Sequence, residues 1–292
     1  MKVLITGGKG FIGSQIAKSL NQLDLEVFTL SRSESIGNTS HFNVDIFEEH
    51  KVRQVLQRVK PEIVVHAAWD TTLETYEKSL ENLKFQKAGL QFALECAAHG
   101  VKKLVMLGSS AEYGLQFAPV SADTSIATPF SEYGKAKYAL LKSLENRKIQ
   151  ESLDFTWLRI FQPYGPMQSS ERLFPTLLKK IHEGSDFVFN FPNQIRDWIH
   201  VIDICKVVIF VIENNLTGIL DVGTGIGTRN SDLLSCMGKV INGNSQIQIS
   251  PEHLDSNDND ILVVHPEAGL FRAGWKPIYD LETGIRQTLA HI

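Results

Sequence analysis

Short apolar runs alternate along the first half of the chain with longer stretches in which apolar residues recur every three or four positions. The short runs are rich in β-branched residues and predict strands, whereas the longer stretches predict amphipathic helices. The expected strands are Val3 to Thr6, Val27 to Leu30, Ile63 to Ala67, Leu104 to Leu107 and Phe155 to Arg159. The expected helices are Gly13 to Asn21, Glu48 to Lys60, Leu80 to His99 and Tyr133 to Gln150. This alternation predicts an α/β fold with a Rossmann-type, doubly wound parallel sheet covered on both faces.

The pattern loosens from Gln162 onward, where proline and glycine become frequent. We therefore expect a dinucleotide-binding Rossmann domain over residues 1–161 plus about 197–223. A smaller substrate-binding region is expected over residues 162–196 and 224–292. Residues 254–260, which contain several Asn and Asp residues, predict a polar loop.

Composition and charge narrow the class of protein. The 292 residues suffice for one large α/β domain with a smaller annex. A net charge of −4 and a pI near 6.1 give no general attraction to nucleic acid or to acidic membranes. The cysteines Cys96, Cys205 and Cys236 are widely spaced, which favours reduced thiols over a disulfide scaffold or a metal site. Without a signal peptide or a spanning apolar run, we expect a cytoplasmic protein.

A glycine-rich turn follows the first expected strand and precedes the first expected helix. Gly7 would permit the tight turn, Gly10 would let a pyrophosphate approach the backbone, and Gly13 would let the helix pack closely on the strand. The free amides at the helix start would then face the phosphates. Glycines also collect in ordinary turns, but their place between a strand and a helix favours a dinucleotide site.

The second expected strand ends in Ser31 and Arg32 rather than in a carboxylate. An NAD-preferring site usually places an acidic residue here, whereas a cation and small hydroxyls suit a 2′-phosphate. Asp24 lies before the strand and Glu34 lies past the turn. The sequence therefore favours NADP as cofactor, with NAD as the alternative if Arg32 is only an exposed loop cation.

Tyr133 and Lys137 are four residues apart in an expected helix, downstream of a strand-like run that ends at Ser109. This spacing places both side chains on one helical face, where an ammonium can favour the anionic form of a phenol. Such a phenol can exchange a proton with a sugar alcohol or ketone if a hydroxyl, here Ser109, holds the same oxygen. The alternative is a surface helix that carries a tyrosine and two solvated lysines.

Together these segments resemble the extended short-chain dehydrogenase/reductase family, specifically its nucleotide-sugar epimerases, dehydratases and reductases. The resemblance covers nearly the whole chain. Its landmarks are Thr6 to Gly13, Asp45-Ile46, His66-Ala67-Ala68, Gly108 to Gly114, Tyr133 to Lys137, Leu158 to Pro166, Arg196 to Val201, Asp221 to Gly225 and Gly274 to Pro277. The resemblance implies catalysis by Ser109, Tyr133 and Lys137, and a homodimer formed through the helices 80–99 and 133–150.

The resemblance also implies which residues bind ligands. The cofactor-binding residues would be Gly7, Gly10, Phe11, Ile12, Gly13, Ser31, Arg32, Asp45, Ile46, Ala67, Ala68, Tyr133 and Lys137. Ser110, Gln162 and Arg196 would bind the nucleotide sugar. Gln162 stands where the family usually has an asparagine, so the substrate pose is less defined than the cofactor pose. Arg196 resembles a phosphate-binding arginine, and its alternative role is a salt bridge with Asp197 or another carboxylate.

The residues after Ser109 decide between reaction classes. Sugar dehydratases of this family carry an Asp-Glu pair there, whereas this chain has Ser110 and Ala111, with Glu112 one position further on. We therefore expect an NADP-dependent reductase of a nucleotide-linked 4-keto-6-deoxy sugar. The alternative is a nucleotide-sugar 4-epimerase of the UDP-hexose type, which needs the same three side chains. A third hypothesis is a catalytically silent NADP-binding sensor or scaffold.

Overall fold

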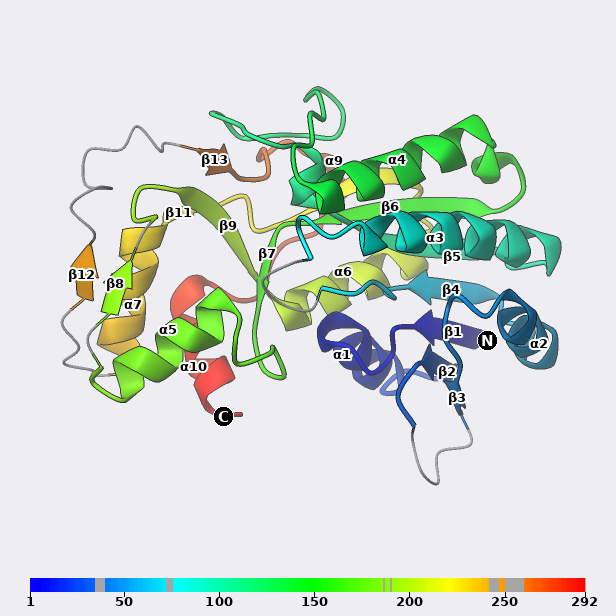
Figure 1. Cartoon of the computed structure of the whole chain (residues 1–292), viewed down its shortest axis with the longest axis horizontal. Coiled ribbons are helices and arrows are strands. Elements are labelled where there is room, and N and C mark those ends of the chain that lie inside the picture. The colour runs from blue at the N-terminus through cyan, green and yellow to red at the C-terminus, as the bar shows by residue number, and fades with distance from the viewer. Residues whose placement is uncertain are drawn as a thin grey trace. The chain divides into compact units, whose positions relative to one another are not determined.

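The chain forms two compact units, each with its own hydrophobic core (Figure 1). The computed structural model describes residues 1–34, 40–71, 76–185, 187–189, 191–241, 247–249 and 260–291. The first unit comprises Met1–Gly114, Ala127–Arg159 and Ile204–Leu220, and the second comprises Leu115–Ile126, Ile160–Asp203 and Asp221–Ile292. Of the predicted polar loop, residues 254–259 lie outside the described residues. Within the described ranges, no helix has the length and apolarity needed to cross a bilayer.

A seven-stranded sheet has the strand order β10-β6-β5-β4-β1-β2-β3. The strands are β1 (Lys2–Thr6), β2 (Glu26–Ser31), β3 (His41–Asn43), β4 (Ile63–His66), β5 (Lys103–Ser109), β6 (Asp154–Ile160) and β10 (Gly218–Val222). β1 pairs in parallel with β2 and β4, β2 pairs with β3, and β4 pairs with β5. The predicted Rossmann-type α/β fold is confirmed. Because the strand order reverses at β1, a crevice is expected at the carboxyl ends of β1 and its two neighbours.

Helices cover both faces of this sheet. α1 (Phe11–Leu20) connects β1 to β2 and so leads toward the β3 edge of the sheet. α2 (Glu49–Val59), α3 (Glu81–Ala98) and α4 (Glu132–Asn146) connect β3 to β4, β4 to β5 and β5 to β6, and so lead toward the β10 edge. Since such crossovers are almost always right-handed, α2, α3 and α4 share one face and α1 lies on the other. Buried residues of the sheet and of α2, α3 and α4 form one core, and α3 runs against α4 (Figure 1).

The second unit contains a smaller sheet and helices that surround a separate core. β7 (Gln162–Tyr164), β11 (Gly227–Arg229) and β13 (Ile261–Leu262) all pair with β9 (Ile195–His200). Tyr164, Trp198 and Ile285 belong to the core, which α5 (Leu173–His182), α7 (Asn230–Ile241) and α10 (Leu281–Leu289) supply with further apolar residues. This unit also contains α9 (Gly269–Arg272) and the parallel pair of β8 (Phe187–Phe189) with β12 (Ile247–Ile249), whereas most of α6 (Val201–Glu213) belongs to the first unit.

Asp197, in β9, joins three segments of the second unit. Its carboxylate is fully buried and accepts hydrogen bonds from the backbone N–H and hydroxyl of Thr224, at 2.6 and 2.7 Å. It also accepts from the N–H groups of Gly225 and Val264, at 2.9 and 3.2 Å. Burial raises the pKa of Asp197, and these hydrogen bonds oppose that shift. The carboxylate therefore fixes two loops against β9.

We expect Asp197→Asn to lower the free energy of unfolding by about 2–4 kcal/mol, because the new amide would face buried donors instead of accepting from them. Urea denaturation followed by circular dichroism measures the change. Asp24→Asn removes the same charge at an exposed position and should change stability by less than about 0.5 kcal/mol. Equal stability of the two variants would contradict the structural role of Asp197.

Candidate functional site

The turn between β1 and α1 has a backbone path that requires glycine. Gly7 has φ +69°, and a Cβ at this position would lie 2.8 Å from the backbone nitrogen of Ala68. A Cβ on Gly13 would collide with the carbonyl oxygen of Gly7. Gly10 caps the start of α1 and has no side chain to occupy the first amides of the helix. These amides are therefore available to an anion, as the sequence predicted for a pyrophosphate.

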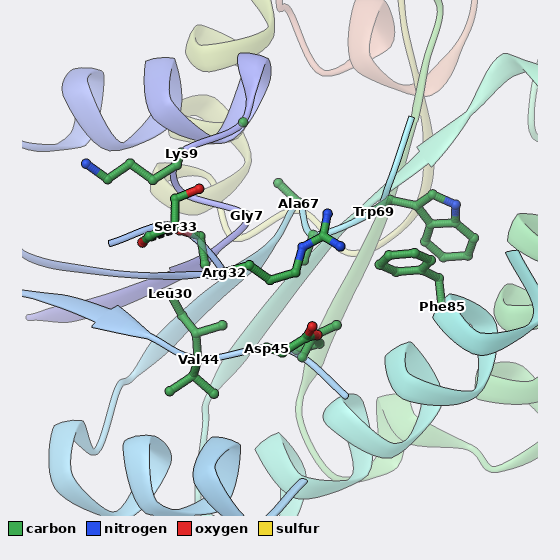
Figure 2. A pocket seen from close by; sticks show the side chains of 14 residues that line it. Gly7, Lys9, Leu30, Arg32, Ser33, Val44, Asp45, Ala67, Trp69 and Phe85 are labelled. Atoms are coloured by element: carbon green, nitrogen blue, oxygen red, sulfur yellow. Dashed lines mark hydrogen bonds between the residues drawn. The ribbon is translucent and has the colours of Figure 1, made fainter. Parts of the chain in front are cut away.

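A cavity of about 230 Å³ lies at this turn, at the carboxyl ends of the central strands (Figure 2). Of the predicted cofactor-binding residues, the lining includes Gly7, Gly10, Ser31, Arg32, Asp45, Ile46, Ala67 and Ala68. Among the described residues, it does not include Phe11, Ile12 and Gly13, which form the first turn of α1, or Tyr133 and Lys137, which lie in α4. The sequence reasoning missed Lys9, Leu30, Ser33, Val44, Trp69 and Phe85. Trp69 directly follows the His66-Ala67-Ala68 landmark, which was the available signal.

Hydrogen bonds from Thr6 hold the wall formed by β4 against the glycine turn. The hydroxyl of Thr6 lies 2.8 Å from Nδ1 of His66 and accepts a hydrogen bond from the N–H of Ala68 at 3.3 Å. His66 is buried and stacks on Phe92, with ring centroids 5.0 Å apart. Burial lowers the pKa of His66 to about 3, and the nearby charge of Lys137 acts in the same direction. His66 is therefore neutral near pH 7, and its hydrogen bond to Thr6 joins β4 to β1.

An ion pair joins two opposite walls of the cavity. Nη2 of Arg32, which follows β2, lies 3.1 Å from Oδ2 of Asp70, which follows β4. Because β1 lies between β2 and β4 in the sheet, this pair spans the carboxyl end of β1. The side chain of Arg32 crosses the cavity in Figure 2, above Asp45 and toward Ala67. The cation predicted to bind a 2′-phosphate thus already faces a carboxylate.

Asp45 and Ile46 form the floor that follows β3. Oδ1 of Asp45 accepts a hydrogen bond from the N–H of Phe47 at 3.1 Å, and the N–H of Asp45 donates to Glu48 at 3.2 Å. Ile46 is buried and presents an apolar surface to the cavity. A short polar turn beside an apolar residue suits the adenine ring, which has polar edges and apolar faces.

Ser109 ends β5 and begins a short 3₁₀ turn, η1 (Ser110–Glu112). Its Oγ accepts a hydrogen bond from the N–H of Ala111 at 3.2 Å, and its own N–H donates to Glu112 at 2.9 Å. This capping box fixes the rotamer and the backbone of Ser109. A Cβ on Gly134 would collide with the carbonyl oxygen of Ala111, so the glycine lets α4 lie directly against η1. The Ser109 turn is thereby brought to the helix that carries Tyr133.

Glu112 is fully buried and bound on every side by hydrogen-bond donors. Oε2 lies 2.8 Å from Nε of Arg159, and Oε1 accepts from the indole N–H of Trp157 at 2.9 Å and from the N–H of Ser109. A carboxylate held in this way anchors the end of β5 and has no free face for proton transfer. Glu112 therefore has a structural role at the end of β5.

Tyr133 and Lys137 lie on consecutive turns of α4, with the Nζ of Lys137 5.9 Å from the centre of the Tyr133 ring. Tyr133 also contacts two aromatic rings edge to face, at 5.2 Å for Tyr76 and 6.0 Å for Trp69 between ring centroids. Its backbone N–H donates to the carbonyl oxygen of Glu77 at 3.1 Å. The phenol thus belongs to an aromatic cluster beside the dinucleotide cavity.

The ammonium of Lys137 is buried. Nζ donates to the carbonyl oxygen of Leu107 at 2.7 Å and lies 3.8 Å from the centre of the Trp69 ring. Burial lowers the pKa of Lys137 to about 7, although the charge of Glu112 partly opposes the shift. A charge at this position would favour the phenolate of Tyr133. The spatial relation of Tyr133 and Lys137 matches the hypothesis drawn from their spacing.

The predicted substrate-binding residues divide between the two units. Ser110 is buried in η1, next to Ser109, in the first unit. Gln162 starts β7 and Arg196 lies in β9, both in the second unit. Arg196 forms an ion pair with Asp260 at 2.6 Å and donates to the carbonyl oxygens of Ile195 and Asp260. Its guanidinium therefore holds β9 to the segment before β13, and the phosphate-binding role of Arg196 stays a prediction.

In the first unit, a cavity of about 230 Å³ at the glycine turn lies near the phenol of Tyr133, and the same unit carries the hydroxyl of Ser109 and the buried ammonium of Lys137. Trp69 joins the cavity to the catalytic candidates, because it lines the cavity and its ring face contacts the ammonium of Lys137. Such a set can exchange one proton with a bound alcohol or ketone while a neighbouring cofactor exchanges a hydride. Among the described residues, no three His, Cys, Asp or Glu side chains form a cluster that could hold a metal ion.

The chain is similar in sequence to nucleotide-sugar enzymes over almost its whole length. It is 24% identical to UDP-glucose 4-epimerase of Lacticaseibacillus casei, over 96% of this chain and 93% of the relative. It is 25% identical to GDP-L-fucose synthase 1 of Arabidopsis thaliana, over 98% of this chain and 91% of the relative. Relatives with two different activities are therefore about equally distant.

A solved structure has the same fold. The UDP-glucose 4-epimerase of Thermus thermophilus, determined in complex with NAD, superposes with a TM-score of 0.87 at 25% identity. The alignment covers 100% of this chain and 98% of that one. The model of the NAD dependent epimerase/dehydratase family matches residues 3–223, which contain the glycine turn, Ser109, Tyr133 and Lys137. The chain therefore belongs to the NAD dependent epimerase/dehydratase family.

Proposed function

We propose that the protein is a nucleotide-sugar 4-epimerase that uses NAD and acts on a UDP-hexose. The observation that carries this proposal is that, among the described residues, the phenol of Tyr133 is the acid–base group of the site, with Ser109 and Lys137 beside it and the dinucleotide cavity next to it. Epimerisation at C4 requires the 4-hydroxyl to lose its proton and C4 to lose a hydride; the hydride then returns to the opposite face of the resulting ketone, and the proton returns to the oxygen. One phenol is sufficient for that proton.

The residues of the cavity fit a dinucleotide. A side chain at Gly7 or Gly13 would fill the space where the backbone turns, and the uncapped start of α1 offers amides to a pyrophosphate. Ile46 and Val44 offer apolar contact at the adenosine end, and Lys9 adds a positive charge. NAD bound here would supply a reversible hydride acceptor. The protein supplies binding, orientation and the proton.

Each of the three side chains has a separate task in this mechanism. Tyr133 takes the proton of the sugar 4-hydroxyl as the alcohol is oxidised, and returns it as the ketone is reduced. Ser109 holds the same oxygen in both directions, with its rotamer fixed by the capping box. Lys137 favours the phenolate and, as the family resemblance implies, would bind the cofactor ribose. Since the proton returns to the same oxygen, no further acid or base is needed.

The sequence relatives support the substrate class. UDP-glucose 4-epimerases from several bacteria match 96–99% of this chain at 24–26% identity. The contacts of the Glu112 carboxylate with Arg159 and Trp157 argue against dehydration, because dehydration needs an additional acid and base. Gln162 and Arg196 would contact the nucleotide diphosphate, and a homodimer would form through α3 and α4.

A reductase of a nucleotide-linked 4-keto-6-deoxy sugar is the second candidate. One observation favours it: the cavity wall after β2 consists of Ser31, Arg32 and Ser33, a set that suits the 2′-phosphate of NADP. A biosynthetic reductase draws on the NADPH pool, whereas an epimerase regenerates its own cofactor. The two candidates therefore differ in the cofactor that they need and not in the catalytic side chains.

The ion pair of Arg32 and Asp70 shifts this balance toward NAD. A 2′-phosphate approaching Arg32 would also approach the Asp70 carboxylate, which lies 3.1 Å from the same guanidinium. Like charges repel, whereas the 2′-hydroxyl of NAD can donate a hydrogen bond to a carboxylate. We therefore infer that Asp70 supplies, from the loop after β4, the acidic group that is missing at the end of β2.

Incubation with UDP-galactose and NAD tests the proposed function directly. The expected result is formation of UDP-glucose, detected by chromatography, with no net production of NADH by absorbance. Oxidation of NADPH with a 4-keto-6-deoxy nucleotide sugar, and no interconversion of UDP-hexoses, would favour the reductase. Cofactor binding without turnover of either substrate would identify a silent member of the family.

We expect Tyr133→Phe to reduce the turnover of UDP-galactose by about 10²–10⁴-fold, because the variant lacks the proton-transferring hydroxyl. NADH affinity and melting temperature should stay close to the values of the unmodified protein. Tyr138→Phe is the matched control, since it removes the same group from the same helix. If Tyr133→Phe and Tyr138→Phe have equal activity, the proton comes from another group.

We expect Asp70→Asn to raise NADPH affinity relative to NADH by roughly fivefold, the effect of one surface charge interaction of about 1 kcal/mol. Adding Arg32→Gln to that variant should remove the gain. Fluorescence titration with each reduced cofactor measures both ratios, and Asp24→Asn, before the opposite end of β2, controls for net charge. A fall in NADPH affinity in Asp70→Asn would show that Asp70 positions Arg32 for the phosphate instead of competing with it.

A further inference from the structure

Trp69 contacts the catalytic pair and lines the cofactor cavity, yet the mechanism above gives it no task. Its ring centre lies 3.8 Å from Nζ of Lys137 and 6.0 Å from the ring centre of Tyr133. In Figure 2 its indole lies beside Phe85, at the end of the cavity away from Lys9. Trp69 therefore lies between the dinucleotide site and the two catalytic side chains.

The indole compensates for an incomplete hydrogen-bond set at Lys137. An ammonium has three N–H donors, and within the described part of the chain the hydrogen-bond acceptor of Lys137 is the carbonyl oxygen of Leu107. The aromatic face of Trp69 covers the same ammonium at cation–π distance. At a buried position, and Lys137 is 4% exposed, this interaction is worth more than at a surface. Trp69 thus stabilises the protonated form of Lys137.

The position of the indole is itself fixed. Nε1 of Trp69 donates to Oδ1 of Asn82 at 2.8 Å, and Asn82 is buried in the first turn of α3. The amide of Asn82 donates in turn to the carbonyl oxygens of Tyr76 and Ser79, at 2.5 and 2.8 Å. Phe85 stacks on the indole with ring centroids 5.5 Å apart. A ring held from its edge and its face has little freedom to leave the ammonium.

We propose that Trp69 is the positioning residue of the catalytic pair, which holds the ammonium of Lys137 charged and in place beside Tyr133. The proposal rests on the role of Lys137 in this site, and it does not depend on which sugar is the substrate. Asn82 acts through Trp69, because it fixes the indole and not the lysine. The arrangement makes the charge of Lys137 depend on an aromatic face as well as on the carboxylate of Glu112.

Other groups also face Lys137 and set the sign of the expected change. Glu112, in η1, raises the pKa of Lys137, whereas burial lowers it to about 7. His66, in β4, is neutral over the relevant range because its own pKa is lowered to about 3. Tyr133, in α4, lies 5.9 Å away. Since the indole stabilises the ammonium, its removal should lower the pKa of Lys137 further.

The test follows the titration of Lys137 by NMR of the full chain with ¹³C-labelled lysine side chains, without cofactor. Lys137→Met assigns the signal. In Trp69→Leu the titration midpoint should move to lower pH by about one unit, whereas Trp69→Phe, which keeps an aromatic face, should move it less than half as far. Trp275→Phe, a tryptophan change in the second unit, should leave the midpoint unchanged. An unchanged midpoint in Trp69→Leu would overturn the proposal.

A second measurement covers the case in which Trp69→Leu does not fold. Biosynthetic replacement of tryptophan by its mono- and difluoro derivatives keeps the shape of the ring but weakens its negative face. The midpoint of Lys137 should then fall stepwise with fluorine content, and a constant midpoint would contradict the proposal. NADH affinity measured against pH gives the functional readout. As the pH rises and Lys137 loses its charge, the affinity of Trp69→Leu should begin to decline at a lower pH than that of the unmodified protein. Failure of the unmodified protein to bind NADH would refute the proposed function, while the apo titration would still decide the role of Trp69.

Discussion

The candidate site depends on the burial of one ammonium group, that of Lys137. Lys137 is 4% exposed, and the shift of its pKa from 10.5 to about 7 corresponds to a cost of roughly 5 kcal/mol for holding the charged form. The end of β5 offers a carbonyl oxygen at Leu107, and Trp69 offers an aromatic face. These contacts reduce that cost but do not remove it, so the protonation of Lys137 is sensitive to the charge of any group that binds beside it. In the proposed mechanism this cost is offset by a charge that acts on Tyr133.

The second buried charge, Glu112, shows how the same unit separates structural from chemical roles. Its carboxylate binds Arg159, Trp157 and the backbone of Ser109, so it fixes the turn that carries the serine hydroxyl. At the same time its charge opposes the loss of the proton from Lys137. Glu112 thus supports the turn of Ser109 and the charge of Lys137 while its own lone pairs are occupied. In the proposed mechanism, proton transfer is therefore assigned to Tyr133.

The sequence predicted the features that depend on local pattern. The strand and helix periodicity predicted the Rossmann-type sheet, and the glycine spacing predicted the position of the cavity. Both patterns depend on residues that are close together in the sequence. Contacts between distant segments could not be read in this way. Arg32 meets Asp70 after 38 positions, and Arg196 meets Asp260 after 64, with no local signal for either pair. Likewise α4 ends at Asn146, before the predicted Gln150, and Lys148 follows with a left-handed backbone, φ 51°.

The two candidate reactions use the same hydroxyl, phenol and ammonium, so these side chains cannot distinguish them. What differs is the fate of the cofactor, which an epimerase keeps and reuses but a reductase must exchange after every turnover. We therefore look for the distinction at the dinucleotide site. The sheet order places the Arg32–Asp70 pair across the carboxyl end of β1, where the dinucleotide would bind. A pair that neutralises Arg32 removes an attraction for the additional phosphate of NADP while leaving the pyrophosphate site at α1 unchanged. We infer that the charge balance around Arg32 bears on which cofactor binds, while the side chains proposed for catalysis are the same in both candidate reactions.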